Sequence, residues 1–286
     1  MNGRASVALG ALAAAAAITF ACSTREYALC REHPEEDPAR CGDAGVDGSE
    51  AGVDGGLCPS DMVFIPVGSG YCIDANETTV AQYQAFYDPT PTAKNVQLCG
   101  WKTKKVDFEP GDWSGQLTRL DLPVVKVDWC DAFEYCSSRG KHLCGAIGGG
   151  PAVYGSDDGG AWFNACTHGD DGLFPYPWGR DASAKANCNG NAHANATATP
   201  PGLLPVGSLG SCEGPYKGLH DLLGNAAEWI DACEVAGSGV QDDRCEQRGG
   251  DFDAGTYLEC ESPSAVASRN GQGNPSPIVG IRCCKP

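Results

Sequence analysis

The pattern of apolar and polar residues predicts only a few regular elements. A short apolar run over Met62–Val67 is typical of a buried strand. Thr79 and Gln82, three residues apart, form a capping box that predicts the start of a helix. The apolar residues that follow fall on one face of that helix: Val80, Tyr83, Phe86 and Tyr87.

A second helix is predicted after the apolar segment Leu122–Val127. Asp128 can cap its start and Gly140 can end it. Its buried face recurs at i, i+3, i+4 and i+7 in Trp129, Ala132, Phe133 and Cys136. Residues 88–121 and 151–217 show no clear period and are rich in Pro, Gly, Asp and Asn, so we expect long ordered loops there.

The segment Gly218–Cys233, GLHDLLGNAAEWIDAC, combines a tight turn with the start of a possible helix. In one interpretation Asn225 caps this helix, and Glu228 reaches back to it. In the other, Asp221 and Glu228 offer carboxylates while the turn leaves backbone carbonyls, those of Gly224 and Ala226, free to point inward. Mixed carboxylate and carbonyl oxygens are the ligands that Ca²⁺ prefers.

The first 57 residues differ from the rest of the chain. Residues 1–21 have the features of an export signal, with Arg4 followed by an apolar run rich in Ala. The run ends at Ala21-Cys22, which predicts a bacterial lipoprotein whose N-terminus is lipid-modified at Cys22; ordinary cleavage, with Cys22 in a disulfide, is the alternative. Residues 22–57 are rich in Gly, Ala and Asp and predict a flexible tether.

We therefore expect a single folded domain over residues 58–286. The whole chain contains 39 Gly and 19 Pro, which indicates much irregular structure. The net charge of −17 argues against nucleic acid as a partner, because a negatively charged chain and a negatively charged nucleic acid repel each other. Seventeen cysteines without metal-binding spacing predict disulfides in an oxidising compartment. Cys30, Cys41 and Cys58 suggest a small cross-linked segment in the tether.

Other chemistries find little support in the sequence. The five histidines lack a zinc-binding spacing such as HxxxH. There is no GxSxG elbow, no P-loop and no dinucleotide fingerprint. His168 beside Asp170 and Asp171 could bind a metal, but THGDDG is more simply a solvated turn.

Seven segments occur in the order found in the formylglycine-generating enzyme family, also called sulfatase-modifying factor domains, and the chain resembles that family over about residues 62–286. They are MVFIPVG (62–68), ETTVAQYQAF (77–86), PVVKVDWCDAFEYC (123–136), YPWG (176–179), GLHDLLGNAAEW (218–229), RGGDF (248–252) and GIRC (280–283). The resemblance implies an α+β fold, related to C-type lectins, with little regular secondary structure and many disulfides.

The resemblance also implies particular structural sites. It favours calcium at Asp221, Gly224, Ala226 and Glu228, because all four family ligand positions are retained. A second family calcium site would use Asn187 and Cys188, but its Asp corresponds to Ala198 here. The family also pairs the cysteine of its YC motif with the one after GFR, which implies a Cys136–Cys283 disulfide.

Family enzymes oxidise a substrate cysteine with O₂ and copper held by two thiolates, a ligand type that suits Cu(I). In this chain the two thiolate positions correspond to Ala254 and Glu259, and Cys260 lies one residue beyond the second. The family's active-site Ser and Trp are replaced as well, by Asp251 and Ala227. We therefore expect calcium but no copper.

The sequence thus favours a lipid-anchored protein of the bacterial envelope, at the outer membrane, whose domain lacks the copper-binding cysteine pair. It would act as a binding or accessory module for an unknown protein or small molecule, or as an enzyme of altered chemistry. Arg269 and Arg282 could line a pocket for an anionic ligand, or they could hold loops by pairing with buried carboxylates. An active oxidase of protein cysteine or another thiol, using Cys260, and a purely structural envelope protein are the competing hypotheses.

Overall fold

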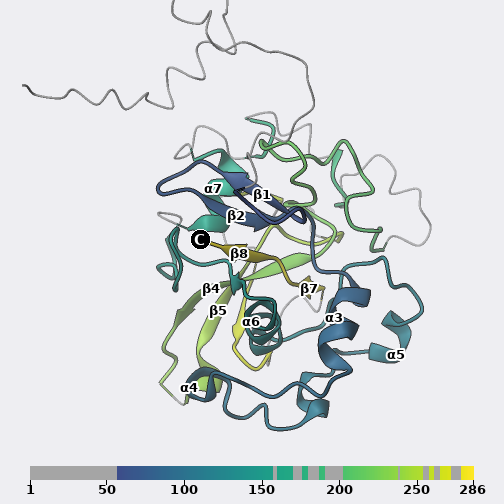
Figure 1. Cartoon of the computed structure of the whole chain (residues 1–286), viewed down its shortest axis with the longest axis vertical. Helices are drawn as coiled ribbons and strands as arrows, with labels where there is room; N and C mark the ends of the chain where they lie inside the picture. Colours follow the sequence, from purple (N-terminus) through teal and green to yellow (C-terminus); the bar gives the residue numbers. More distant parts are fainter. Residues whose placement is uncertain are drawn as a thin grey trace, which may run out of the picture. The chain divides into compact units, whose positions relative to one another are not determined.

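The computed structural model describes residues 57–156, 160–169, 176–179, 187–190, 202–237, 239–253, 258–260, 265–271 and 278–286. The chain divides between residues 50 and 51 into two units, and every described residue lies in the second (Figure 1). Cys22, Cys30 and Cys41 therefore lie outside the described residues. No helix in the described part of the chain is long and apolar enough to cross a membrane.

The first sheet is antiparallel and has the strand order β1-β2-β8-β3. Its strands are β1 (Met62–Ile65), β2 (Tyr71–Asp74), β3 (His142–Leu143) and β8 (Cys283–Lys285). The predicted strand at Met62–Val67 is confirmed as β1, two residues shorter than expected. The sheet therefore joins the start of the domain to its last residues.

The second sheet has the order β6-β5-β4-β7. Its strands are β4 (Ala227–Glu234), β5 (Arg244–Arg248), β6 (Ala265–Ser268) and β7 (Val279–Gly280). The β4–β7 pair is parallel and the others are antiparallel. The interpretation in which a helix starts after Asn225 is wrong, because strand β4 occupies that segment.

Two longer helices, α3 (Val80–Tyr87) and α6 (Trp129–Ser138), are confirmed where the sequence predicts them. Thr79 and Gln82 form the expected capping box of α3, and Asp128 caps α6 by accepting from the Asp131 amide. Tyr83 and Tyr135 stack with ring centres 5.8 Å apart, which packs one helix against the other. Capping and a single apolar face are thus sufficient to define both helices.

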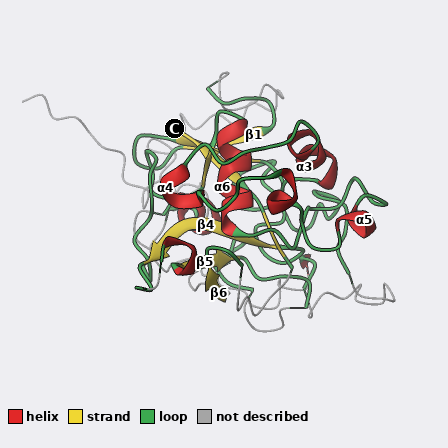
Figure 2. Cartoon of the chain, turned by 90° about the horizontal axis from the view of Figure 1, so that it is seen from below, coloured by secondary structure: helices red, strands yellow, loops and turns green. Residues whose placement is uncertain are grey.

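Helix α6 lies beside β4 (Figure 2), held by two reciprocal hydrogen bonds. The indole of Trp129 donates to the Ile230 carbonyl at 2.9 Å, and that of Trp229 donates to the Val127 carbonyl at 3.0 Å. Both indoles are fully buried. This contact forms the centre of the core and holds the segment after Asn225 in place.

The loops contain short elements that the sequence pattern does not reveal. Within residues 88–121 lie α4 (Val96–Cys99), η1 (Lys105–Phe108) and α5 (Trp113–Gln116). The segment expected to be mostly loop, 151–217, contains α7 (Ala161–Thr167), whose seven residues are all buried. A further short turn of helix, η3 (Val240–Asp242), precedes β5.

All fourteen cysteines from Cys58 to Cys284 form disulfides. The seven pairs are Cys58–Cys72, Cys99–Cys130, Cys136–Cys283, Cys144–Cys284, Cys166–Cys260, Cys188–Cys212 and Cys233–Cys245. The Cys136–Cys283 bond implied by the family resemblance is present. Cys58 pairs with Cys72, so the interpretation that it belongs to a cross-linked tether segment is wrong.

Candidate functional site

The side chain of Asn225 forms hydrogen bonds that hold the turn before β4 in one conformation. Asn225 has a left-handed backbone with φ of 60°, so it does not cap a helix. Its Oδ1 accepts from the Asn189 side chain and from the Leu204 amide, each at 2.9 Å. Its Nδ2 donates to Glu77 Oε2 at 2.6 Å. The amide therefore joins three separate loops.

Gly224 fits this turn for steric reasons as well as conformational ones. Its φ is 79°, and a Cβ at this position would lie 2.4 Å from the Asn189 carbonyl oxygen. No described residue donates a hydrogen bond to the buried carbonyl oxygens of Gly224 or Ala226. Buried carbonyl oxygens usually have a hydrogen-bond partner. Because these two have no donor among the described residues, a cation could take that place.

The two expected carboxylate ligands lie in the same buried cluster. Asp221 Oδ2 accepts from the Gly207 amide at 2.6 Å. Glu228 Oε1 accepts from Arg282 Nε at 2.8 Å, and its Oε2 accepts from the indole of Trp162. Burial raises the pKa of both carboxyl groups. Asp221 and the two carbonyls offer oxygen atoms of the kind that calcium binds, whereas Glu228 already has a protein donor on each oxygen.

A third carboxylate, Glu77, belongs to the cluster, and the sequence reasoning did not identify it. Glu77 Oε1 accepts from the Ala226 amide at 2.8 Å, and Oε2 accepts from Asn225. Burial, followed by repulsion from Asp221 and Glu228, raises its pKa well above the ordinary value. No local pattern in the sequence marks it, because the residues that it contacts, Asn225 and Ala226, lie about 150 positions further along the chain.

The cluster contains more acidic than basic groups. Glu77, Asp221 and Glu228 are 1%, 3% and 1% exposed, and Arg282 is fully buried. One guanidinium lies among three buried carboxyl groups, so any further ionised carboxyl needs a proton or a cation to balance its charge. Among the described residues, no three His, Cys, Asp or Glu side chains converge as a metal site, so a cation here would depend on the two backbone carbonyls.

Neither arginine that was a candidate for an anion pocket is available to a ligand. Arg282 pairs with Glu228 and also donates to two backbone carbonyls. Arg269 pairs with Asp243 at 3.1 Å, and its guanidinium lies 4.2 Å from the ring centre of Trp129. Both side chains are buried, which confirms the alternative that they pair with buried carboxylates.

The positions of the family thiolates contain no thiolate. Ala254 lies outside the described residues. Glu259 is half-buried and accepts from the hydroxyl of Tyr176 at 3.3 Å. Cys260 is fully buried in its disulfide with Cys166, so the hypothesis that it supplies a copper ligand is wrong. A disulfide sulfur has no negative charge to bind Cu(I).

The second expected calcium site is only partly described. Asn187 is exposed, and its backbone carbonyl accepts from the Ser211 hydroxyl at 2.8 Å. Cys188 is buried in its disulfide with Cys212, and its carbonyl accepts from the Gly190 amide. Ala198 lies outside the described residues, so calcium at Asn187 and Cys188 stays a prediction.

Comparisons with known proteins address the fold and the family. No curated protein matches the sequence. Among solved structures, the chain is similar to the crystal structure of CarF, with 19% identity and a TM-score of 0.45 over 76% of this chain and 86% of that one. It is similar to Treponema denticola variable protein 1, with 17% identity and a TM-score of 0.45 over 76% and 84% of the two chains. It is also similar to PvdO from Pseudomonas aeruginosa, with 19% identity and a TM-score of 0.40 over 76% and 80%.

A family model covers most of the chain. The sulfatase-modifying factor enzyme 1-like domain matches residues 57–286. This range agrees with the described unit, whose fold is a disulfide-rich mixture of short helices and strands. The chain therefore belongs to the formylglycine-generating enzyme, or sulfatase-modifying factor, family.

Proposed function

We propose that this chain is a binding module of the bacterial envelope that retains the family fold without the family's copper chemistry. The supporting observation is that all fourteen cysteines between Cys58 and Cys284 are paired in disulfides. Oxidation of a thiol by O₂ at copper needs thiolate ligands, and the domain has none to offer. Its role is then to hold a ligand or a partner protein.

Calcium is the metal that this module would bind. Asp221 and the carbonyls of Gly224 and Ala226 would supply hard oxygen ligands. Glu228 would complete the set through a remaining lone pair, since each carboxylate oxygen can accept a second contact beside its bond to Arg282 or Trp162. The ion would neutralise the excess charge of the carboxylate cluster and fix the turn before β4. Glu77 would act as a positioning residue, because it holds the Ala226 amide and the Asn225 side chain.

Export and anchoring follow from the N-terminal sequence. Residues 1–21 would direct the chain out of the cytoplasm, and Cys22 would carry the lipid that attaches it to the outer membrane. Seven disulfides are in keeping with an oxidising compartment outside the cytoplasm. The tether of residues 22–57 would then separate the domain from the membrane surface.

Peptide mapping of the exported protein tests this proposal. The protein is alkylated without reduction, digested, and analysed by mass spectrometry before and after reduction. We expect no alkylated cysteine between residues 58 and 286 before reduction, and a Cys166–Cys260 cross-linked peptide. Two free thiols that include Cys260 would contradict the proposal and favour a working oxidase.

A further inference from the structure

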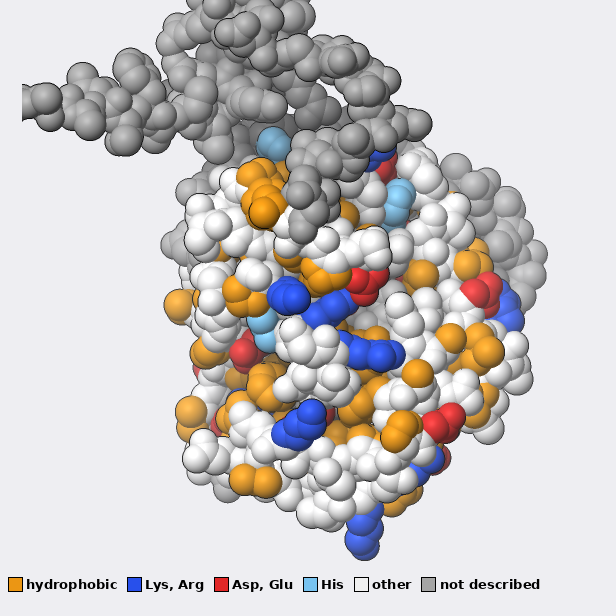
Figure 3. Space-filling view, in the orientation of Figure 1, with side chains coloured by type: hydrophobic (Ala, Val, Ile, Leu, Met, Phe, Trp, Pro, Cys, Tyr) orange, Lys and Arg blue, Asp and Glu red, His pale blue; other side chains and the backbone are white. Residues whose placement is uncertain are grey.

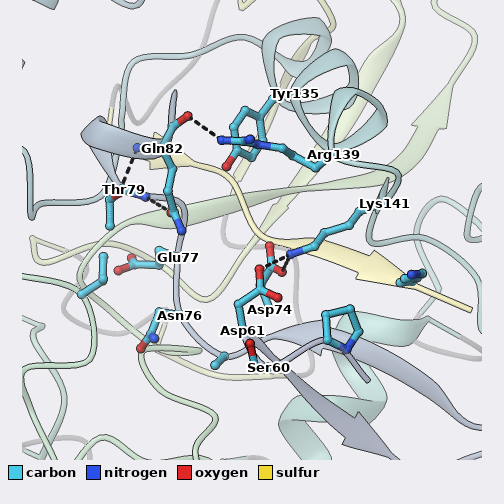
Figure 4. A pocket seen from close by; sticks show the side chains of 14 residues that line it. Ser60, Asp61, Asp74, Asn76, Glu77, Thr79, Gln82, Tyr135, Arg139 and Lys141 are labelled. Atoms are coloured by element: carbon cyan, nitrogen blue, oxygen red, sulfur yellow. Dashed lines mark hydrogen bonds and ion pairs between the residues drawn. The ribbon is translucent and has the colours of Figure 1, made fainter. Parts of the chain in front are cut away.

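A pocket opens on the face of the domain where the first sheet meets helix α6. Its volume is about 560 Å³, within the range of about 300–1,000 Å³ typical of small-molecule sites. Gln82, Tyr135 and Arg139 lie at one end, and Ser60, Asp61 and Asn76 lie at the other (Figure 4). Glu259 lies at the second family thiolate position and Cys260 lies beside it. Neither residue lines this pocket, so the pocket is separate from that position.

The carboxylates that line this pocket are already engaged. Lys141 Nζ pairs with Asp61 at 2.7 Å and with Asp74 at 2.5 Å. The second oxygen of Asp74 accepts from the Cys283 amide at 3.0 Å. Both oxygens of Glu77 accept from the turn before β4. Asp61 and Asp74 thus share the single cation of Lys141, and Glu77 is buried with both oxygens bonded inside the protein.

Two of the lining cations lack such partners. Among the described residues, no carboxylate forms an ion pair with Arg139 or Lys285, and Asp61 interacts with Arg139 only at longer range. His142 pairs with Cys284 across β3 and β8, and continuing this register by one residue places Lys141 opposite Lys285. Lys141 is offset by Asp61 and Asp74, so among the described residues that line the pocket Arg139 and Lys285 are the cations with no carboxylate at ion-pair distance.

Basic side chains are also visible on the surface around this pocket. Lys and Arg side chains gather in the middle of the face where Figure 1 places β8 and α6 (Figure 3). The whole chain has a net charge of −17, so a basic area of this kind opposes its average character. Such an area attracts anions rather than cations.

The rest of the wall suits an organic ligand with polar groups. The Arg139 guanidinium lies 5.5 Å from the ring centre of Tyr135 and donates to the Gln82 carbonyl. The ring of Tyr135 therefore offers an apolar surface directly beside a cation.

We propose that this pocket binds a small organic anion, whose carboxylate or phosphate group lies between Arg139 and Lys285. The body of the ligand lies in the pocket beside Tyr135, which lines it. The assignment rests on the proposed function as a binding module, for which it supplies the class of ligand. Guanidinium and ammonium donors form charge-assisted hydrogen bonds with both kinds of anion.

Isothermal titration of the purified full-length protein tests the assignment. The probes are glucuronate, which carries a carboxylate, glucose 6-phosphate, which carries a phosphate, and uncharged glucose. Each is titrated into the unmodified protein and into a double variant, Arg139→Gln with Lys285→Gln. The matched control is Lys94→Gln with Arg119→Gln, which removes the same charge from outside the pocket.

We expect at least one anion to bind with a Kd of about 1 mM or tighter while glucose does not. The pocket variant should weaken this binding by about tenfold or more, and the control should leave it within about twofold. Preference for one anion identifies the group that the site recognises. Saturation by neither anion, equal binding of glucose, or an equal loss in the control would overturn the assignment. If no anion binds, the pocket assignment fails while the thiol count, which tests the proposed function, is unaffected. If an anion binds but the domain has free thiols, the proposed function is refuted and the pocket assignment stands.

Discussion

Replacing Arg282 by Met tests whether the buried charge cluster is held as the structure indicates. Arg282 is fully buried and donates to Glu228 Oε1 at 2.8 Å, to the Asp74 carbonyl at 2.7 Å and to the His220 carbonyl at 2.8 Å. Its loss leaves Glu228 in the core without its cation. Breaking a buried ion pair in this way costs about 3–5 kcal/mol.

For a domain of this size, 1 kcal/mol corresponds to about 2–4 °C in Tm, so Arg282→Met should lower Tm by about 6–20 °C. Arg244→Met is the matched control, because Arg244 pairs with Glu234 at 3.0 Å while both side chains are largely exposed. An exposed pair contributes about 0–1 kcal/mol, so the control should lose less than about 4 °C.

The effect should also depend on pH. Burial raises the pKa of Glu77, Asp221 and Glu228, and Arg282 opposes this rise at all three. A carboxyl group whose pKa is higher in the folded state binds more protons there, so stability increases as pH falls through the raised pKa. The loss in Arg282→Met should therefore be smaller at about pH 5 than at about pH 8.

Thermal unfolding in EDTA, followed by tryptophan fluorescence, measures both effects without a bound cation. The indole of Trp162 donates to Glu228, so one of the six tryptophans whose fluorescence is followed contacts the cluster. If Arg282→Met unfolds within a few degrees of Arg244→Met, or if its loss is equal at both pH values, the reasoning is refuted.

Three further predictions concern the metal, the disulfides and the anchor. Saturating calcium should stabilise the protein by about 2.7 kcal/mol at one hundred times Kd, and Asp221→Asn should remove most of this gain in a calorimetric scan. The gain should increase as pH rises, because the ligand carboxyls, whose pKa values are raised by burial, must be deprotonated; a gain that is independent of pH would contradict this. Replacing Cys166 and Cys260 together by Ala should cost about 2–5 kcal/mol in denaturant unfolding, since their bond closes a long loop; no change would show that the bond does not form. Cys22→Ala should move the protein from the membrane to the soluble fraction on centrifugation, and retention in the membrane would exclude Cys22 as the anchor.

The sequence predicted those elements whose formation depends on local interactions. Both capped helices are where the capping boxes and apolar faces place them, since capping involves residues three positions apart. The same local reasoning failed at Asn225, which one interpretation of the sequence made the cap of a helix. Distant residues decide that segment: Asn189, Leu204 and Glu77 hold the asparagine side chain, and β5 and β7 pair with the strand that follows.

The candidate site shows the same division. Asp221 and Glu228 could be identified because they lie in one short motif. Glu77 could not, because it approaches the turn from about 150 residues away and no periodicity links it to Ala226. The partners of Arg269 and Arg282 were likewise left open by the sequence, since a buried ion pair and a ligand pocket require the same residue type. The α7 helix was missed because it lies within a region dominated by Gly and Asp.

The metal content of the exported protein tests the central claim most directly. The purified protein is exposed to calcium and to Cu(I), freed of unbound ions by gel filtration, and analysed for both elements. A domain with its cysteines in disulfides and its carboxylate cluster intact should retain calcium and no copper. Retention of copper in a one-to-one ratio with protein, or the absence of calcium, would contradict the account.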